Sequence, residues 1–401
     1  MRTKLLIASL FALTAAVVVG YPLAKGAGKG TAPVKAPAAV ARMPGKPPRV
    51  EVVFVLDTTS SMTDLIDAAK ENIWSIATTM AQADPAPDLR MGLVAFRDRG
   101  DAYVTRVVDL SSDLDSMYAT LMDFEAVGGG DGPESVNEAL HDAVHRISWS
   151  QDPTSYQVVF LVGDAPPHMD YPDDVKYPET IRAAVAKGIV VNTILAGNDT
   201  TTELEWQKIA ELNQGEFFQV AQSGSAVAVE TPFDADIAAL SRALDDTRLF
   251  FGDGETQRQL ARKEAATDKL HAAGSTASRA KRASFNASAA GHANAYGEHE
   301  LVDAVANGRV DLGAIAKSDL PPALQGLGAD ERKQVVEEAG AKRAELTRRI
   351  AALAEQRRGY IDENVAARVG TAESLDQKLY DTVKAQAGAK GLRYEADAPA
   401  L

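Results

Sequence analysis

The sequence predicts an α/β fold with a doubly wound, mostly parallel sheet, followed by an α-helical C-terminal region. Short apolar runs of strand length alternate with segments in which apolar residues recur at three- and four-residue steps, a pattern typical of strands connected by helices. The composition, with 45% hydrophobic and 24% charged residues in a chain of 401, is that of an ordinary globular protein. We therefore expect right-handed crossovers and ligand sites at the carboxyl ends of the strands.

The N-terminal segment has the pattern of an export signal. A short basic start precedes an apolar run from Leu5 to Gly20, so residues 1–23 are predicted to be a signal peptide. The stretch from Leu5 to Leu23 is only just long enough to span a membrane, and an uncleaved signal anchor is the alternative. Residues 24–48, rich in Pro, Ala, Lys and Gly, are predicted to be a tether. We expect a secreted, periplasmic or cell-envelope protein, with no membrane span in the mature chain unless this segment stays uncleaved.

The main domain is predicted to span residues 49–250, and each of its elements follows from a local pattern. Val50–Leu56 is a nearly continuous apolar run, as expected for a central parallel strand that is covered on both faces. The next segment carries apolar residues at helical spacing from Met62 to Met80. The same reasoning predicts strands at 89–96, 103–110, 157–162, 189–195 and 216–220, and helices at 114–124, 135–147, 181–187, 203–212 and 237–244.

Beyond residue 250 the composition changes. Residues 251–296 have few large apolar side chains and are predicted to be a low-complexity linker that is mobile or weakly helical. Residues 297–401 are predicted to be helical, with a short coiled coil near 329–364, where apolar residues recur at three- and four-residue steps. Arg343 and Arg357 interrupt that seam, so a helix docked on its own domain is an alternative to a homo-oligomer formed through the C-terminal helices.

Net charge and cysteine content exclude several classes of function. The formal net charge of -14 argues against nucleic acid or an anionic membrane as the main partner, because both would repel the chain. The chain has no cysteine, which excludes disulfides, thiolate nucleophiles and cysteine zinc sites. Metal ions and protein surfaces remain as binding partners.

Oxygen-bearing side chains follow three segments that are predicted to end at one edge of the sheet. Carboxylates and hydroxyls without sulfur or imidazole suit a hard divalent cation, namely Mg, Ca or Mn. Because side chains alternate along an extended chain, Asp57, Thr59 and Ser61 are expected to face one point while Thr58 and Ser60 face away. The three segments are Asp57-Thr58-Thr59-Ser60-Ser61, Gly128-Gly129-Gly130-Asp131 before Pro133-Glu134, and Gly163-Asp164-Ala165-Pro166.

This ordered set of three loops resembles the metal-ion-dependent adhesion site of von Willebrand factor A (VWA) domains. The resemblance implies that Thr59 and Ser61 bind the ion directly and that Asp57 and Asp164 act as water-mediated ligands. It also implies a protein partner whose acidic side chain completes the coordination shell, in a protein-protein or adhesive interaction. The resemblance covers about Arg49 to Asp246.

One departure from the family pattern concerns Asp131, which stands near the position of a family threonine. It would add a third carboxylate to the ligand set. Added negative charge strengthens the attraction for a cation and leaves the bound ion less electrophilic. We therefore expect firm ion retention and a weaker dependence on an acidic partner residue.

Helix capping is the simplest alternative for two of these positions. Ser61 with Asp64, and Asp131 with Glu134, have the spacing of capping boxes. Capping explains neither of the aspartates that end the two apolar strands, so the metal site is the preferred interpretation.

Enzymatic alternatives find less support in the sequence. Position 59 is Thr where a haloacid dehalogenase-like phosphatase needs an acid, and His141 and His145 resemble part of a zinc-protease helix without an evident third ligand. No activated serine accompanies the site. We predict a binding module that is not an enzyme. The first alternative is a structural envelope protein with a fold-stabilising ion and an oligomerising tail, and the second is a metal-dependent hydrolase.

Two further features lie near the predicted site. His168 is expected to shape its loop. The charged run from Arg97 to Asp101 is expected to be a solvated turn or to border the binding face.

Overall fold

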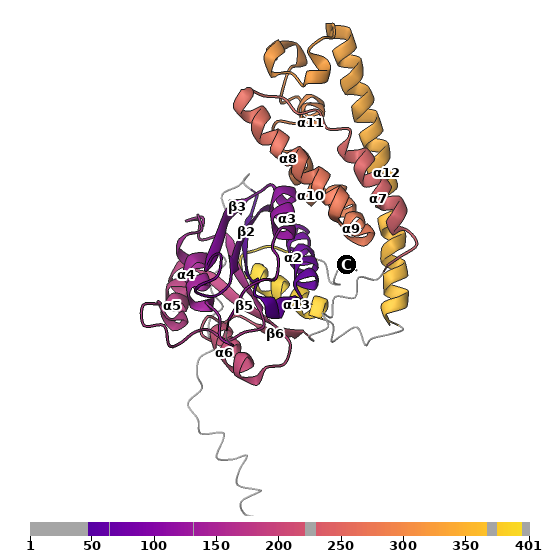
Figure 1. Cartoon of the computed structure of the whole chain (residues 1–401). Coiled ribbons are helices and arrows are strands. Elements are labelled where there is room, and N and C mark those ends of the chain that lie inside the picture. The colour runs from indigo at the N-terminus through magenta and orange to yellow at the C-terminus, as the bar shows by residue number, and fades with distance from the viewer. Residues whose placement is uncertain (1–46, 64, 131, 221–229, 367–374, 395–401) are drawn as a thin grey trace, which may run out of the picture. The chain divides into compact units, whose positions relative to one another are not determined.

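A six-stranded sheet lies at the centre of the N-terminal half of the chain (Figure 1). In this computed structural model the described residues are 47–63, 65–130, 132–220, 230–366 and 375–394. The strand order is β3-β2-β1-β4-β5-β6, with β3 antiparallel to β2 and the other neighbours parallel, which confirms the predicted fold class. The strands are β1 (Arg49–Asp57), β2 (Asp88–Phe96), β3 (Thr105–Ser111), β4 (Tyr156–Gly163), β5 (Ile189–Ala196) and β6 (Phe217–Val220).

Strand β1 supplies side chains to the cores on both faces of the sheet. Val52, Phe54 and Leu56 belong to one apolar cluster, and Val53 and Val55 belong to the other. This division follows from the alternation of side chains along a strand and explains why the apolar run is nearly continuous. The carboxyl end of β1 is thereby fixed between two packed layers.

Helices cover both faces of the sheet. The first cluster is built with α2, α3 and α13, and the second with α4, α5 and α6. These helices are α2 (Ile66–Ala81), α3 (Leu114–Met122), α4 (Val136–His145), α5 (Tyr177–Lys187), α6 (Thr200–Glu211) and α13 (Leu375–Gly388).

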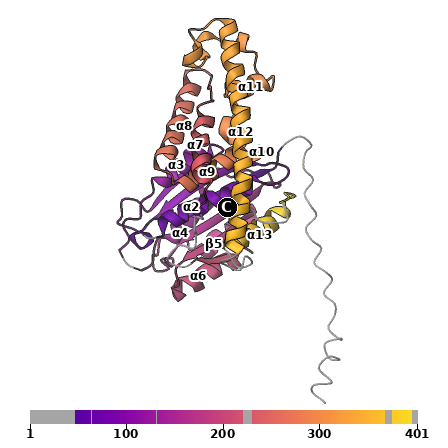
Figure 2. The ribbon, with the colours of Figure 1, turned by 90° about the vertical axis from the view of Figure 1, so that its right-hand side faces the viewer.

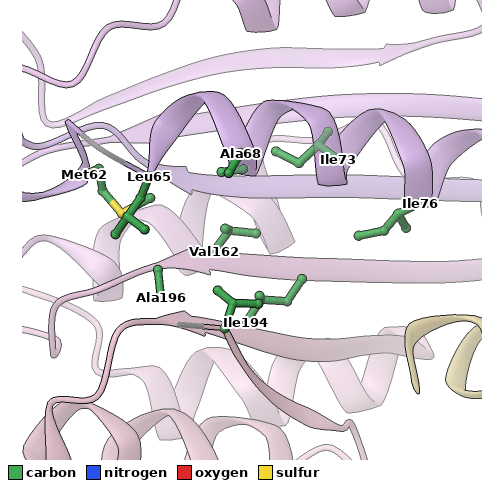
Figure 3. A pocket seen from close by; sticks show the side chains of 10 residues that line it. Met62, Leu65, Ala68, Ile73, Ile76, Val162, Ile194 and Ala196 are labelled. Atoms are coloured by element: carbon green, nitrogen blue, oxygen red, sulfur yellow. The ribbon is translucent and has the colours of Figure 1, made fainter. Parts of the chain in front are cut away.

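A small apolar cavity of about 20 Å³ lies between α2 and the sheet (Figure 3). Met62 and Leu65 line it from the start of α2, opposite Val162 and Ile194 of the sheet. A cavity of this size has room for about one water molecule, and apolar walls keep such a space dry. It is therefore a packing space between α2 and the strands β4, β5 and β6, and not a ligand pocket.

The structure departs from the predicted linker at 251–296. This stretch forms three helices, α8 (Gly254–Ala273), α9 (Thr276–Asn286) and α10 (Ala289–Tyr296). Ala280 and Ala283 pack against α7 (Asp234–Asp245), because small side chains let helices approach closely. Arg282 is also buried. A composition poor in large apolar residues was therefore no sign of a linker here, since alanines and paired charges form the interior.

Helix α12 (Ala329–Ala366) packs within its own chain, beside α7, α9 and α11 (Leu301–Ala306) (Figure 2). Its stripe residues Leu346 and Ile350 are buried in the cluster that α7 and α9 complete. Arg343 is buried against Glu300, and Arg357 against Asp234, so the residues that interrupt the predicted coiled-coil seam hold the helix in place. Of the two alternatives for this region, the docked helix is the one observed.

Helix α13 returns to the sheet after the helical region. Leu379, Val383 and Ala387 enter the same cluster as α2. Gln386 forms a reciprocal amide pair with Asn192 of β5, at 2.9 and 3.1 Å, and accepts a 2.7 Å hydrogen bond from Tyr156. The VWA-like half of the chain is therefore completed by a helix that lies more than 150 residues beyond β6.

Truncating the α13 side chain Leu379 is expected to destabilise the sheet domain. Leu379→Ala should lower the free energy of unfolding by about 2–5 kcal/mol, because it leaves a cavity in the shared core. The matched control is Leu204→Ala on α6, where the side chain is 54% exposed and the expected change is within about 0.5 kcal/mol. Urea unfolding measures both. Equal, small effects would show that α13 contributes little to the domain.

Candidate metal centre

The first loop of the candidate site begins with Asp57, the last residue of β1. Its Oδ1 atom accepts hydrogen bonds from the backbone N–H of Thr59 at 2.9 Å and from Thr59 Oγ1 at 2.7 Å. Thr58 turns the other way, where its hydroxyl donates to the carbonyl of Phe96 at 2.8 Å and contacts Tyr103 Oη at 2.8 Å. This is the alternation that the extended chain predicts for Thr58.

Hydroxyl groups connect the ends of β1 and β4. Thr59 Oγ1 lies 3.0 Å from Ser61 Oγ, and Ser61 Oγ donates a 2.8 Å hydrogen bond to Asp164 Oδ1. The four side chains thus form a continuous row from Asp57 to Asp164, across neighbouring parallel strands. Ser61 is exposed, so the row opens to the molecular surface.

The protons of this row leave one contact without a donor. Thr59 Oγ1 contacts Asp57 and Ser61, and Ser61 Oγ contacts Asp164 as well. The two hydroxyl groups have two protons for these three contacts, so one contact lacks a donor unless a further proton or a cation enters the row. An additional proton or a bound cation would therefore stabilise this row.

Burial of the two carboxylates makes a nearby positive charge more stabilising still. Asp57 is fully buried, and its Oδ2 atom has no hydrogen-bond partner among the described residues. Burial first, and the negative charge of Asp164 second, raise the pKa of Asp57 to about 7. Burial also raises the pKa of Asp164. The pair of carboxylates is therefore costly to keep ionised without a counter-charge.

A glycine at the end of β4 allows the two strands to approach each other here. A Cβ atom on Gly163 would lie 2.5 Å from the Cβ of Asp57 and 2.9 Å from its Oδ2. Any larger residue would push the Asp57 carboxylate away from the row. The Gly163-Asp164 pair is thus a local sequence signal for the close approach.

The second loop runs alongside the first. Val127 N–H donates to the carbonyl of Thr58 at 3.0 Å, and Ser60 N–H donates to the carbonyl of Gly128 at 2.9 Å. Gly128 and Gly129 have φ angles of 90° and 77°, a backbone conformation that favours glycine. The loop therefore lies beside the hydroxyl row.

Two predicted positions lie outside the described residues. They are Asp131, the proposed third carboxylate, and Asp64, the proposed capping partner of Ser61. For the described positions, capping is not observed: Ser61 Oγ contacts Thr59 and Asp164 instead, and the N-cap of α4 is Ser135.

Glu134 is a residue of the site that the sequence reasoning treated only as a capping partner. It is 3% exposed, and a Cβ atom on Gly129 would lie 2.7 Å from Glu134 Oε1 and 3.2 Å from Thr59 Cβ. Its carboxylate therefore lies beside Thr59. Its backbone N–H donates to Pro166 at 2.9 Å and its carbonyl accepts from His168 at 3.0 Å, which joins the second loop to the third. The Pro-Glu sequence directly after the glycines was the available signal.

The histidines do not form a metal centre of their own. His168 is buried, bonds Asp170 Oδ1 through Nδ1 at 2.8 Å and stacks on Tyr171, which supports its predicted role in shaping the loop. His141 and His145 stack at 4.3 Å near the end of α4 that is farther from the loops. In the described ranges, no three His, Cys, Asp or Glu side chains are grouped so that they could hold a metal. The zinc-protease alternative thus lacks its third ligand there, and any ion at the row would depend on the hydroxyls.

Comparison with known proteins points to one domain family. A family model described as von Willebrand factor A domain matches residues 51–232. The von Willebrand factor A domain-containing protein 7 of Rattus norvegicus and that of Mus musculus are each 35% identical over 120 residues, and that of Homo sapiens is 33% identical over the same length. These matches cover 30% of this chain and only 12% of each relative.

Solved structures give weaker matches. Proximal thread matrix protein 1 from the mussel byssus, in crystal form 2, has a TM-score of 0.35 at 16% identity, covering 44% of this chain and 42% of that one. The structure of the same protein with a zinc-occupied MIDAS motif has a TM-score of 0.36 at 17% identity, covering 45% and 43%. The SpRpn10 VWA domain has a TM-score of 0.35 at 12% identity, covering 45% of this chain and 95% of that one. The sheet order and the three loops agree with the matched family model. Residues 51–232 of this chain are therefore a von Willebrand factor A domain.

Proposed function

We propose that the VWA domain is a protein-binding module whose binding face is organised by one divalent cation, and that it is not an enzyme. The observation that carries the proposal is the 3.0 Å contact between Thr59 Oγ1 and Ser61 Oγ, in a row whose three contacts share two hydroxyl protons. Oxygen atoms about 3.0 Å apart are the neighbouring ligands expected around an octahedral ion with bonds of about 2.1 Å. A cation bound by both hydroxyl oxygens takes the place of the missing proton donor. It also neutralises the negative charge of the two aspartates.

The donor set fits Mg, Ca or Mn. Thr59 and Ser61 would be direct ligands, and Asp57 and Asp164 would hold the ion through the hydroxyls and through water. Asp131 is proposed from the sequence alone as a further acidic group of the site. A bound ion would supply a coordination position for an oxygen atom of the partner, such as a carboxylate, and Ser61, which is exposed, would be one of the residues that hold the ion.

A hydrolase is the weaker candidate at this edge of the sheet. Ser61 donates a hydrogen bond to Asp164, so it has a carboxylate partner, but among the described residues no imidazole base lies within hydrogen-bond distance of it. His168 is buried and engaged by Asp170. We therefore favour binding over catalysis.

The setting of the module outside the cytoplasm is proposed from residues 1–48, which lie outside the described residues. A signal segment followed by a tether would place the VWA domain in the envelope or in the medium. None of the described helices carries an apolar stretch long enough to cross a membrane. The acidic net charge of -14 favours a protein partner over nucleic acid.

A structural protein with a fold-stabilising ion is the second candidate, favoured by the large helical region that packs on the domain. The two candidates differ in what the ion does. If the ion only stabilises the fold, chelation lowers the thermal midpoint and partner recovery follows the folded fraction. If the ion organises a binding face, partner recovery falls under chelation while the chain is still fully folded.

Ser61→Ala against Ser60→Ala is the matched pair that tests the proposal. We expect Ser61→Ala to weaken Mn²⁺ binding at least about tenfold, because it removes an oxygen ligand. Ser60→Ala should bind Mn²⁺ like the unsubstituted chain, since Ser60 is exposed and alternation places it facing away. Calorimetric titration measures the affinity, and capture of envelope proteins on each immobilised chain, with and without chelator, measures partner binding. Equal affinities in the two variants would contradict the assignment of Ser61.

A further inference from the structure

The turn Arg97–Asp101, directly after β2, contacts the first two loops of the site and the segment that follows the third loop. Its charged sequence favoured a solvated turn, yet Arg97 is 9% and Asp98 6% exposed. Buried charges are costly unless each one is bonded, so their contacts show what the turn holds.

Arg97 joins the first loop to the second. Its Nε donates to the carbonyl of Thr58 at 3.2 Å and its Nη2 donates to the carbonyl of Glu125 at 3.0 Å. The guanidinium lies over the ring of Tyr103 at 4.4 Å, and the Tyr103 hydroxyl in turn contacts Thr58. One planar cation thus fixes the spacing between two backbone segments that flank the hydroxyl row.

Asp101 binds the backbone of the glycine loop. Its Oδ2 atom accepts the N–H of Gly129 at 2.8 Å and the N–H of Asp98 at 3.1 Å. A Cβ atom on Gly128 would lie 2.4 Å from the same carboxylate, so the loop rests directly on it. This contact fixes the position of Gly128 and Gly129 beside Thr59.

Asp98 extends the connection to the third loop. Its Oδ1 accepts from Ser135 Oγ at 2.9 Å and its Oδ2 accepts from the hydroxyl of Tyr171 at 2.9 Å. Ser135 precedes α4 and Tyr171 follows the third loop. The turn therefore touches the first two loops beside the hydroxyl row and the segment that follows the third loop.

We infer that Arg97 and Asp101 are positioning residues of the metal centre: they set the distance between the first and second loops without touching the ion. This inference rests on the proposed ion site and deepens it. Groups that orient metal ligands typically affect affinity by about 10–100-fold when they are removed.

The test compares Mn²⁺ affinity with stability in the full chain. Arg97→Lys keeps the charge, but an ammonium cannot span two carbonyls, so we expect Mn²⁺ binding to weaken about 10-fold or more. Asp101→Ala should have an effect of similar size, whereas Asp101→Asn should bind nearly as the unsubstituted chain does. The asparagine keeps one oxygen that can accept both N–H groups, which now converge on Oδ2.

The control for a general loss of stability is Leu379→Ala, which weakens the shared core without removing a hydrogen bond of the loops and should leave Mn²⁺ affinity unchanged at temperatures where the chain is folded. Affinity loss in Arg97→Lys and Asp101→Ala, with rescue in Asp101→Asn, supports the inference. If Arg97→Lys and Asp101→Ala are both folded and bind Mn²⁺ as tightly as the unsubstituted chain, the positioning role is wrong, although the ion site itself is not contradicted. If the unsubstituted chain binds no Mn²⁺, the proposed function itself fails.

Discussion

Asp57→Asn is expected to abolish Mn²⁺ binding while changing the stability of the ion-free chain by no more than about 1 kcal/mol. The carboxylate is the buried anchor of the hydroxyl row, and it accepts both the N–H and the hydroxyl proton of Thr59. Asparagine keeps an oxygen for these two donors and removes the negative charge that attracts the cation.

The near-constant stability follows from two opposing changes. The amide removes a charge that burial and Asp164 make costly, and it introduces a buried N–H₂ group at the position of Oδ2, which has no partner among the described residues. Calorimetric titration measures ion binding, and urea unfolding in the presence of chelator measures stability. A variant that loses several kcal/mol without any ion present would make Asp57 a structural residue, and one that still binds Mn²⁺ would remove it from the site.

Arg282→Ala is expected to have the largest effect on stability, a loss of about 3–5 kcal/mol. Arg282 lies on α9, is 2% exposed, and bonds Asp115 of α3 and Asp245 of α7 at the junction of the helical region with the VWA domain. Its removal leaves two buried carboxylates facing each other without their main counter-charge. Urea unfolding measures the loss, and Arg258→Ala, at an exposed pair on α8, is the control that should change little.

The acid dependence of stability provides a second readout of this junction. Burial alone would raise the pKa of Asp115 and of Asp245, but the charge of Arg282 and its hydrogen bonds hold both pKa values below their usual range. Their stabilising contribution is therefore full above about pH 4 and is lost as the pH falls further toward the folded-state pKa values. In Arg282→Ala, the largest charge that lowers these pKa values is gone, so both values rise and the loss of stability below about pH 4 should be smaller. An acid profile unchanged by the substitution would contradict this account.

The sheet and the first loop could be predicted because their signals are local. A nearly continuous apolar run that ends in Asp57 identifies a covered parallel strand, and the alternation of side chains separates Thr59 from Thr58. The contacts of Thr58 with Phe96 and Tyr103 agree with that separation.

The elements that were missed depend on partners far away in the sequence. Arg282 and Asp115 are 167 residues apart, and nothing near either residue indicates that both are buried. The same holds for Gln386 and Asn192, 194 residues apart, which attach α13 to the sheet. A charged residue is read as exposed until its partner is known, and for that reason the turn Arg97–Asp101 and helices α8–α10 could not be predicted from composition.

The most direct test of the metal centre is an anomalous difference map from crystals of this chain soaked in Mn²⁺. We predict one strong peak at the carboxyl end of β1, within about 2.0–2.6 Å of both Thr59 Oγ1 and Ser61 Oγ. A map without a peak at this edge of the sheet, or with a peak only elsewhere, such as at His141 and His145, would contradict the assignment of these hydroxyls as ion ligands.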